Sequence, residues 1–256
     1  MKKIPYFAGA LTLILSATWP AMGFAGHPLL TEDTGTQGAG NFQLELTHDH
    51  GDTNISGLKV HEQSFNTVLS IGLKDNLDAI ISLPYERISE RGLSDSTVMG
   101  FADVEIAAKW RFYEGGPLSI ALRPGLGLPT GNEDKGLSAG HLAPSLFAVT
   151  TYAIDPWAFH LHLGYGHNIF DGTEQRTHIY HASVAAEYFV SESLRFVGDA
   201  SVESNPDLSG DTSVGSVVLG MVYAVVPDLD IDLGYRKGLT DPAPDHTWQA
   251  GLALRF

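Results

Sequence analysis

The sequence contains no cysteine, which excludes disulfide frameworks, thiolate metal sites and cysteine nucleophiles. Basic residues are also scarce, because 15 lysines and arginines stand against 30 acidic residues and the formal net charge is −15. Nucleic-acid binding needs lysine and arginine to meet phosphates, so a chain this acidic does not suit it. The folded state must be stabilised by burial and hydrogen bonding rather than by covalent cross-links.

Long apolar runs are missing as well. The stretch of apolar and small residues from 7 to 17 is too short for a helix that crosses a bilayer of about 30 Å. It follows Lys2 and Lys3 and precedes the small residues Gly23 and Ala25, a pattern typical of a secretory signal peptide. We expect residues 1–25 to be a signal peptide that is cleaved after Ala25, so that the rest of the chain leaves the cytoplasm.

The clearest pattern that is present is the alternation in the last stretch, residues 246–256. Trp248, Leu252, Leu254 and Phe256 fall on one face of a strand, with polar or small residues between them. A final amphipathic strand that ends in phenylalanine resembles the signal read by the barrel-insertion machinery of Gram-negative bacteria. We therefore interpret these four residues as an assembly signal and this machinery as a partner.

The same alternation recurs along the chain, interrupted by turns rich in glycine and proline. It predicts twelve strands, at 42–47, 65–73, 78–86, 102–112, 118–128, 142–154, 157–166, 180–188, 195–203, 217–223, 229–236 and 246–256. Short turns alternate with long polar loops, among them 49–59, 89–100 and 129–140. This alternation is typical of an up-and-down barrel with short periplasmic turns and longer extracellular loops. Residues 26–40 are predicted to be an irregular lead-in, and residues 41–256 the barrel.

A soluble sandwich or barrel would also show period-two strands, so the decision depends on where the apolar face points. Five aromatic residues lie at strand ends beside short turns or at the terminus, as in a girdle at one membrane interface: Phe112, Trp157, Tyr188, Tyr223 and Phe256. Charges alternate with apolar residues within the strands, which suits a wet lumen. We predict an all-β fold, a single transmembrane up-and-down antiparallel β-barrel of about 12 strands in the cell outer membrane.

The residues between the apolar positions are the candidates for lining the lumen. They are Asp103, Glu105, Lys109, Arg111, Arg123, His160, His162, Arg195, Asp199, Asp230, Asp232, Arg236 and Arg255. Two interpretations stay open for them. They form ion pairs that fill the interior, or they line a selective polar path in which acidic rings favour cations.

Histidines form two groups in the sequence. His160 and His162 share a strand face, with His181 expected nearby, and a metal or proton site is one interpretation of that group. We favour polar filling of the lumen instead. His48 belongs with His50 and His61 around the first long loop, where an external metal ion is again the alternative to ordinary solvated side chains. We nominate no metal ligand and no cofactor.

An enzyme is the other class to consider. Ser145 lies four residues from His141, and Ser183 lies two residues from His181, but neither pair has a third partner or a nucleophile motif in the sequence. We therefore assign no catalytic residue and predict that the protein is not an enzyme.

Several segments together resemble the outer-membrane transporter family that is associated with the phenol meta-cleavage degradation pathway, the MetA-pathway of phenol degradation family. They are 27–36 (HPLLTEDTGT) with 42–45 (FQLE), 100–105 (GFADVE) with 109–112 (KWRF), and 129–133 (PTGNE). The resemblance spans most of the mature chain and implies a barrel fold, but it does not identify a substrate. The long-chain fatty-acid transporters are a more distant comparison, and the lead-in is short for their N-terminal plug.

The function that we predict is passive uptake of small molecules, hydrophobic or aromatic ones among them, through an outer-membrane channel. A non-conducting structural or surface-binding barrel is the alternative, followed by an outer-membrane lipid hydrolase. Apart from the solute and the insertion machinery, the expected partners are outer-membrane lipid and lipopolysaccharide, and nucleic acid is not among them.

Overall fold

The computed structural model describes residues 26–55, 58–92, 95–138, 140–167, 176–206 and 210–256, and the predicted signal peptide lies outside them. Within these residues, no helix is both long and apolar enough to cross a membrane. The elements are β1 (Phe42–Ile55), β2 (Leu58–Lys74), β3 (Leu77–Arg91), β4 (Ser96–Phe101), β5 (Val104–Gly115), β6 (Leu118–Leu128), the short 3-10 helix η1 (Glu133–Lys135), β7 (Ala143–Ile154), β8 (Trp157–His167), β9 (His178–Phe189), β10 (Leu194–Glu203), β11 (Val214–Val226), β12 (Leu229–Gly238) and β13 (His246–Arg255).

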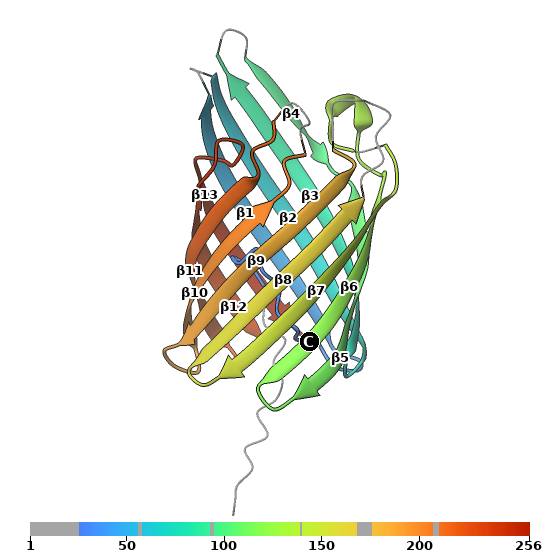
Figure 1. Cartoon of the computed structure of the whole chain (residues 1–256), viewed down its shortest axis with the longest axis vertical. Helices are drawn as coiled ribbons and strands as arrows, with labels where there is room; N and C mark the ends of the chain where they lie inside the picture. Colours follow the sequence, from blue (N-terminus) through green and yellow to red (C-terminus); the bar gives the residue numbers. More distant parts are fainter. Residues whose placement is uncertain (1–25, 56–57, 93–94, 139, 168–175, 207–209) are drawn as a thin grey trace, which may run out of the picture.

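The strands form one closed antiparallel barrel (Figure 1). Sequence neighbours pair with each other, and β13 returns to β1 over ten residue pairs, from Gln43–Arg255 to Asp52–His246. Phe42 and Phe256 extend this pairing with two backbone hydrogen bonds of 2.7 and 3.0 Å. Strands β4 and β5 both pair with β3 and together occupy one position, so the barrel has twelve positions and the predicted architecture is confirmed.

The apolar side chains face outward and the charged ones face inward. Leu219 is 73% exposed and Leu233 57%, whereas Asp230 and Asp232, on alternate positions of the same strand as Leu233, are 3% and 5% exposed. A soluble fold would show the reverse, because apolar side chains are stabilised by removal from water. The exposed apolar surface is thus the surface that contacts lipid, and the protein is an outer-membrane barrel.

Exposed aromatic residues mark two levels of the barrel wall. Beside the short turns, Trp157 packs on Tyr188 with ring centroids 4.7 Å apart, and the five residues predicted for this girdle are all exposed. Toward the opposite rim, Tyr235 packs on Trp248 with ring centroids 4.9 Å apart, and Tyr165 packs on Tyr180 with ring centroids 5.5 Å apart. Amphipathic rings prefer the lipid headgroup level, so the two sets bracket the apolar band.

Two predicted loops are wrong. Residues 49–59 are mostly strand, because β1 continues to Ile55 and β2 begins at Leu58. Residues 89–100 are also mostly strand, because β3 continues to Arg91 and β4 begins at Ser96. These strands rise above the rest of the rim in Figure 1. Their upper ends carry polar residues on both faces, so no apolar alternation marked them as strands. The predicted loop 168–175 lies outside the described residues.

The lead-in, residues 26–40, turns into the barrel interior (Figure 1). The turn into β1 uses Gly38 and Gly40, whose φ angles of +80° and +84° are left-handed and favour glycine. Gly72 on β2 lies directly against this turn, where a Cβ atom would come within 1.8 Å of the Gly38 carbonyl oxygen. Glycine at position 72 therefore lets the lead-in approach the wall.

Candidate functional site in the barrel lumen

The first anchor of the lead-in is His27. Its Nδ1 lies 2.5 Å from Asp232 Oδ1 on β12, and its Nε2 lies 3.1 Å from Asp49 Oδ1 on β1. Burial lowers the pKa of this imidazole, but the hydrogen bonds and charges of the two carboxylates outweigh burial and raise the pKa to about 9. His27 is therefore a cation at neutral pH and donates from both nitrogens, which joins β12 to β1.

The next anchor is formed by the backbone. The amides of Leu30 and Thr31 donate to Asp199 Oδ2 on β10, at 3.0 and 2.8 Å. The Thr31 hydroxyl donates to Ser183 Oγ on β9 at 2.7 Å. Asp199 and Ser183 are buried, so these bonds satisfy polar groups that would otherwise be costly to bury.

Glu32 is the ionic centre of the lead-in. Its Oε2 lies 3.0 Å from Lys109 Nζ on β5, and its Oε1 lies 3.0 Å from Arg123 Nε on β6. Arg123 also binds Glu105 through two parallel bonds of 3.0 and 2.9 Å. Burial raises the pKa of Glu32, but Arg123, Lys109 and His162 outweigh it and lower the pKa to about 2. Glu32 is therefore ionised at neutral pH.

The far end of the lead-in reaches the opposite wall. The Thr34 amide donates to Thr151 Oγ1 on β7 at 3.1 Å, and the Thr34 hydroxyl shares a 2.5 Å hydrogen bond with Ser119 on β6. The Gln37 amide donates to both carboxylate oxygens of Asp78 on β3, at 3.2 and 3.0 Å. From His27 to Gln37 the segment thus contacts the wall from β12 around to β3. The lead-in is short for a plug, but it crosses the lumen.

A second ionic network lies beside the lead-in. Glu187 on β9 contacts His160 Nε2 at 3.1 Å and Arg195 Nε at 2.6 Å. Asp230 on β12 continues it, with Arg255 Nη2 at 2.8 Å and Arg195 Nη1 at 3.7 Å. The network links five strands, and both carboxylates are almost fully buried. Removal of one member would leave an uncompensated buried charge, so each member is expected to contribute strongly to stability.

The remaining nominated residues lie outside the Glu32 and Glu187 networks, although Arg236 shares Asp49 with His27. Arg111 contacts Glu114 at 3.2 Å near a short turn, and Arg236 contacts Asp49 at 3.4 Å. Asp103 accepts a 3.0 Å hydrogen bond from the Gly131 amide and so fixes the loop after β6. Sequence reasoning missed Glu32 and Glu187, the acids at the centres of the two networks. The excess of arginine and lysine among the nominated residues of β5 and β6 is the signal that an acid from elsewhere was needed.

Phe147 on β7 is an apolar ring on the polar inner face. Its centroid lies 4.7 Å from the ring of His162, and the Arg123 guanidinium carbon lies 5.8 Å from it. Gly164 makes room for the ring, because a Cβ atom there would lie 2.2 Å from Phe147 Cε1. The lumen thus offers one aromatic face beside a guanidinium group.

The histidine group predicted around His160 and His162 does not converge on a common point. His160 is bonded to Glu187 and, at 2.9 Å, to Thr151, whereas His181 is bonded to Glu203 at 3.2 Å. His162 packs against the His181 ring with centroids 5.2 Å apart. These contacts agree with polar filling of the lumen.

A third partner does exist for one Ser–His pair. His181 Nε2 lies 3.0 Å from Ser183 Oγ, and His181 Nδ1 lies 3.2 Å from Glu203 Oε2. This order of groups is that of a hydrolase triad. Ser183 is only 3% exposed, however, and its oxygen accepts the Thr31 hydroxyl bond, so the lead-in covers it.

The closed antiparallel barrel, with apolar side chains outside and charged ones inside, defines an outer-membrane β-barrel. The sequence profile of the family described as "Putative MetA-pathway of phenol degradation" matches residues 25–256. The chain therefore belongs to that family, and the resemblance seen in the sequence is confirmed.

Several solved structures share the fold. An outer membrane channel from Pseudomonas putida F1 has a TM-score of 0.70 at 16% identity, over 85% of this chain and 96% of that one. The KdgM porin has a TM-score of 0.55 at 10% identity, over 84% of this chain and 99% of that one. The NanC porin has a TM-score of 0.53 at 10% identity, over 83% of this chain and 98% of that one. No curated protein matches the chain. Identities this low show the fold alone.

Proposed function

We propose that this protein is a passive outer-membrane channel for small molecules, and that the lead-in limits its conductance. The observation that carries the proposal is a closed barrel with a polar, charged inner face, crossed by a segment that is held mainly by ion pairs and hydrogen bonds to side chains of the wall. Ion-paired walls suit a wet path rather than a dry core. The nominated residues that contact the lead-in, chiefly Lys109, Arg123, Asp199 and Asp232, set the narrow point of that path.

The solute class follows from Phe147 and Arg123. A small aromatic molecule with an anionic or hydroxyl group can stack on the ring and bond to the guanidinium group, whereas a purely aliphatic one gains only burial. Small aromatic solutes, benzoate for example, are therefore favoured over sugars of the same size. The outer rim is the side from which Phe147 is approached, because the lead-in lies toward the short turns.

Two other functions have some support. A barrel sealed by the lead-in would serve as a structural or surface-binding protein. A hydrolase is suggested by Ser183, His181 and Glu203, but Ser183 pairs with neighbouring strands on both sides, so its amide is not free to bind an oxyanion. We accordingly propose that the protein is not an enzyme. Lipopolysaccharide, outer-membrane lipid and the insertion machinery complete the proposed partners.

Planar-bilayer conductance and proteoliposome swelling test the proposal directly. We expect single-channel current in the intact protein, and faster swelling with benzoate than with a pentose. Phe147→Ala is expected to remove most of that preference without abolishing current, whereas Phe159→Ala, on the lipid-facing side of β8, should leave it unchanged. A barrel with neither current nor flux, before and after removal of the lead-in contacts, would refute the channel.

A further inference from the structure

Four polar side chains gather on the outer surface of the barrel, above the apolar band. Asp52 on β1 is paired across the strands with His61 on β2 and with His246 on β13. His50, two residues before Asp52, is paired with Trp248 on β13, a member of the upper aromatic set. The alternation of strand faces places all four on the side of Trp248. This external histidine cluster (His50, Asp52, His61 and His246) therefore lies at the level of lipid headgroups or just above it.

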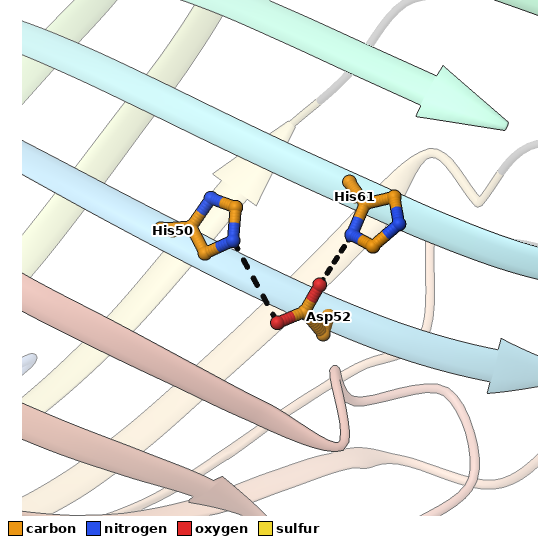
Figure 2. A group of neighbouring side chains, drawn as sticks. All are labelled: His50, Asp52 and His61. Atoms are coloured by element: carbon orange, nitrogen blue, oxygen red, sulfur yellow. Dashed lines mark hydrogen bonds and ion pairs between the residues drawn. The ribbon is translucent and has the colours of Figure 1, made fainter.

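Three imidazoles converge on the Asp52 carboxylate. His61 Nδ1 contacts Oδ1, whereas His50 Nε2 and His246 Nε2 lie 3.7 and 3.2 Å from Oδ2. Figure 2 shows His50 and His61 on neighbouring strands, both directed at Asp52. The ligand atoms of His50, Asp52 and His61 all lie within 4.8 Å of one another. Donor atoms around a tetrahedral ion with bonds of about 2.0–2.2 Å are roughly 3.4 Å apart, so small side-chain rotations close the set of three. His246 is outside this set and contacts it through Asp52, so it needs a larger rotation to become the fourth ligand.

The composition of the cluster is that of a transition-metal site. Neutral imidazole and carboxylate are the donors that Zn²⁺ and Cu²⁺ prefer, and three nitrogens with one oxygen complete four-coordination. The alternative is a hydrogen-bonded cluster in which each ring points a proton at Asp52. In that arrangement the Asp52 carboxylate is the common partner of three imidazole rings, and two of these rings share Oδ2. Side-chain exposures of 28% to 40% leave the group reachable from solvent.

We propose that His50, His61, His246 and Asp52 bind a divalent transition metal ion, Zn²⁺ or Cu²⁺, on the outer surface of the barrel. The ion ties β2, β1 and β13 together and so bridges the β1–β13 pairing where the barrel closes. The sequence had grouped His48 with His50 and His61. The structure replaces His48, which stacks on Phe65 at 4.2 Å, with His246 and Asp52.

A second exposed histidine pair supplies the matched control. His167 and His178 face each other across β8 and β9 with ring centroids 5.2 Å apart, and Tyr165 rather than a carboxylate is the partner that lies between them. The double variant His167→Ala/His178→Ala removes as many imidazoles as His50→Ala/His61→Ala. Only the latter should change metal affinity.

The experiment is isothermal titration of ZnCl₂ into the untagged full-length barrel in detergent, with heat-modifiable gel mobility as the folding control. We expect one ion per chain and a loss of affinity of about 10-fold or more in His50→Ala/His61→Ala and in Asp52→Ala. The control variant should bind as the intact protein does. Bound Zn²⁺ should raise the thermal midpoint of the intact barrel but not of the variants.

Electron paramagnetic resonance of the Cu²⁺-loaded protein counts the imidazoles. We expect nitrogen couplings in the spectrum of the intact protein and their loss in His50→Ala/His61→Ala/His246→Ala. If that variant does not fold in cells, it can be refolded in detergent before Cu²⁺ is added. Titrations without saturable heat, or a Cu²⁺ spectrum that is unchanged in the folded triple variant, would overturn the site. The result is independent of whether the barrel conducts.

Discussion

Arg123 binds Glu32 through a 3.0 Å contact between Arg123 Nε and Glu32 Oε1, and the same guanidinium group donates two hydrogen bonds to Glu105 on the wall. The lead-in is thereby bound to a side chain that is already fixed by another partner. Less conformational entropy is lost on docking to such a group than on ordering a free arginine. The retention of the lead-in should therefore depend strongly on Glu32.

Removal of the Glu32 carboxylate should release the centre of the lead-in. In Glu32→Ala, Lys109 and Arg123 lose a half-buried counter-charge, and we expect a cost of about 1–3 kcal/mol together with higher bilayer conductance. Glu114→Ala is the matched control, because the Glu114 side chain is 59% exposed and its pair with Arg111 should contribute about 0–1 kcal/mol. Equal conductance in the two variants would mean that Glu32 does not control the path.

A disulfide between Thr31 and Ser183 should show whether the lead-in must move. Their hydroxyl oxygens are 2.7 Å apart, and a chain without cysteine allows a single engineered pair. In Thr31→Cys/Ser183→Cys we expect low conductance when oxidised and recovery after reduction.

The control for this experiment is Ser201→Cys/Ser216→Cys, which joins β10 to β11 within the wall, where the oxygens are 2.9 Å apart. Its conductance should not respond to reductant. If the Thr31–Ser183 disulfide leaves current and swelling unchanged, solutes pass beside a stationary lead-in.

The docking of the lead-in should depend on pH in two opposite directions. His27 has a pKa raised from 6.5 to about 9, so its contribution is complete below pH 6.5 and is lost as the pH rises through 9. Glu32 has a pKa lowered from 4.5 to about 2, so its contribution is complete above pH 4.5 and is lost as the pH falls toward 2. Conductance should be lowest between pH 4.5 and 6.5.

Single substitutions separate the two limbs of that profile. His27→Gln should flatten the alkaline limb and Glu32→Gln the acid limb, each without affecting the other. Bilayer recordings across the pH range provide the measurement. A profile that keeps both limbs in both variants would place the titrating groups elsewhere.

Phe256 should matter for insertion in cells and much less for folding in detergent. The ring is 64% exposed and stacks on Phe42 with centroids 5.6 Å apart, so little packing is lost in Phe256→Ser. We expect less barrel in the outer membrane but normal refolding in detergent. Phe112→Ser, which removes a girdle residue that is 46% exposed, should insert normally. Equal insertion of both variants would argue against the assembly signal at Phe256.

The wall of the barrel could be predicted from sequence because each strand repeats a local pattern. Ile231 and Leu233 alternate with Asp230 and Asp232, which places the two sets on opposite faces of the wall. Once the signal peptide and the terminal phenylalanine indicate an outer-membrane barrel, the apolar set is the one that meets lipid. One irregular point has a local cause as well. Pro124 cannot donate to a ladder, and the β5–β6 pairing skips the positions opposite Pro124 and Arg123.

The interior could not be predicted in the same way, because long-range contacts decide it. The lead-in has no period, and its place depends on Lys109 and Arg123, which follow Glu32 by more than seventy residues. The external histidine cluster could not be predicted for a different reason. His50 and Asp52 were placed in a loop, and the partner from the far end of the chain, His246, becomes a neighbour only when β13 returns to β1.

The turn at Gly38 and Gly40 joins the lead-in to the first strand, beside the last strand to be synthesised. A segment tethered at that point can be enclosed while the sheet is still an open ribbon, and no chain end has to be threaded through a finished ring. The pairing of β1 with β13 is then the step that encloses the lead-in in the lumen.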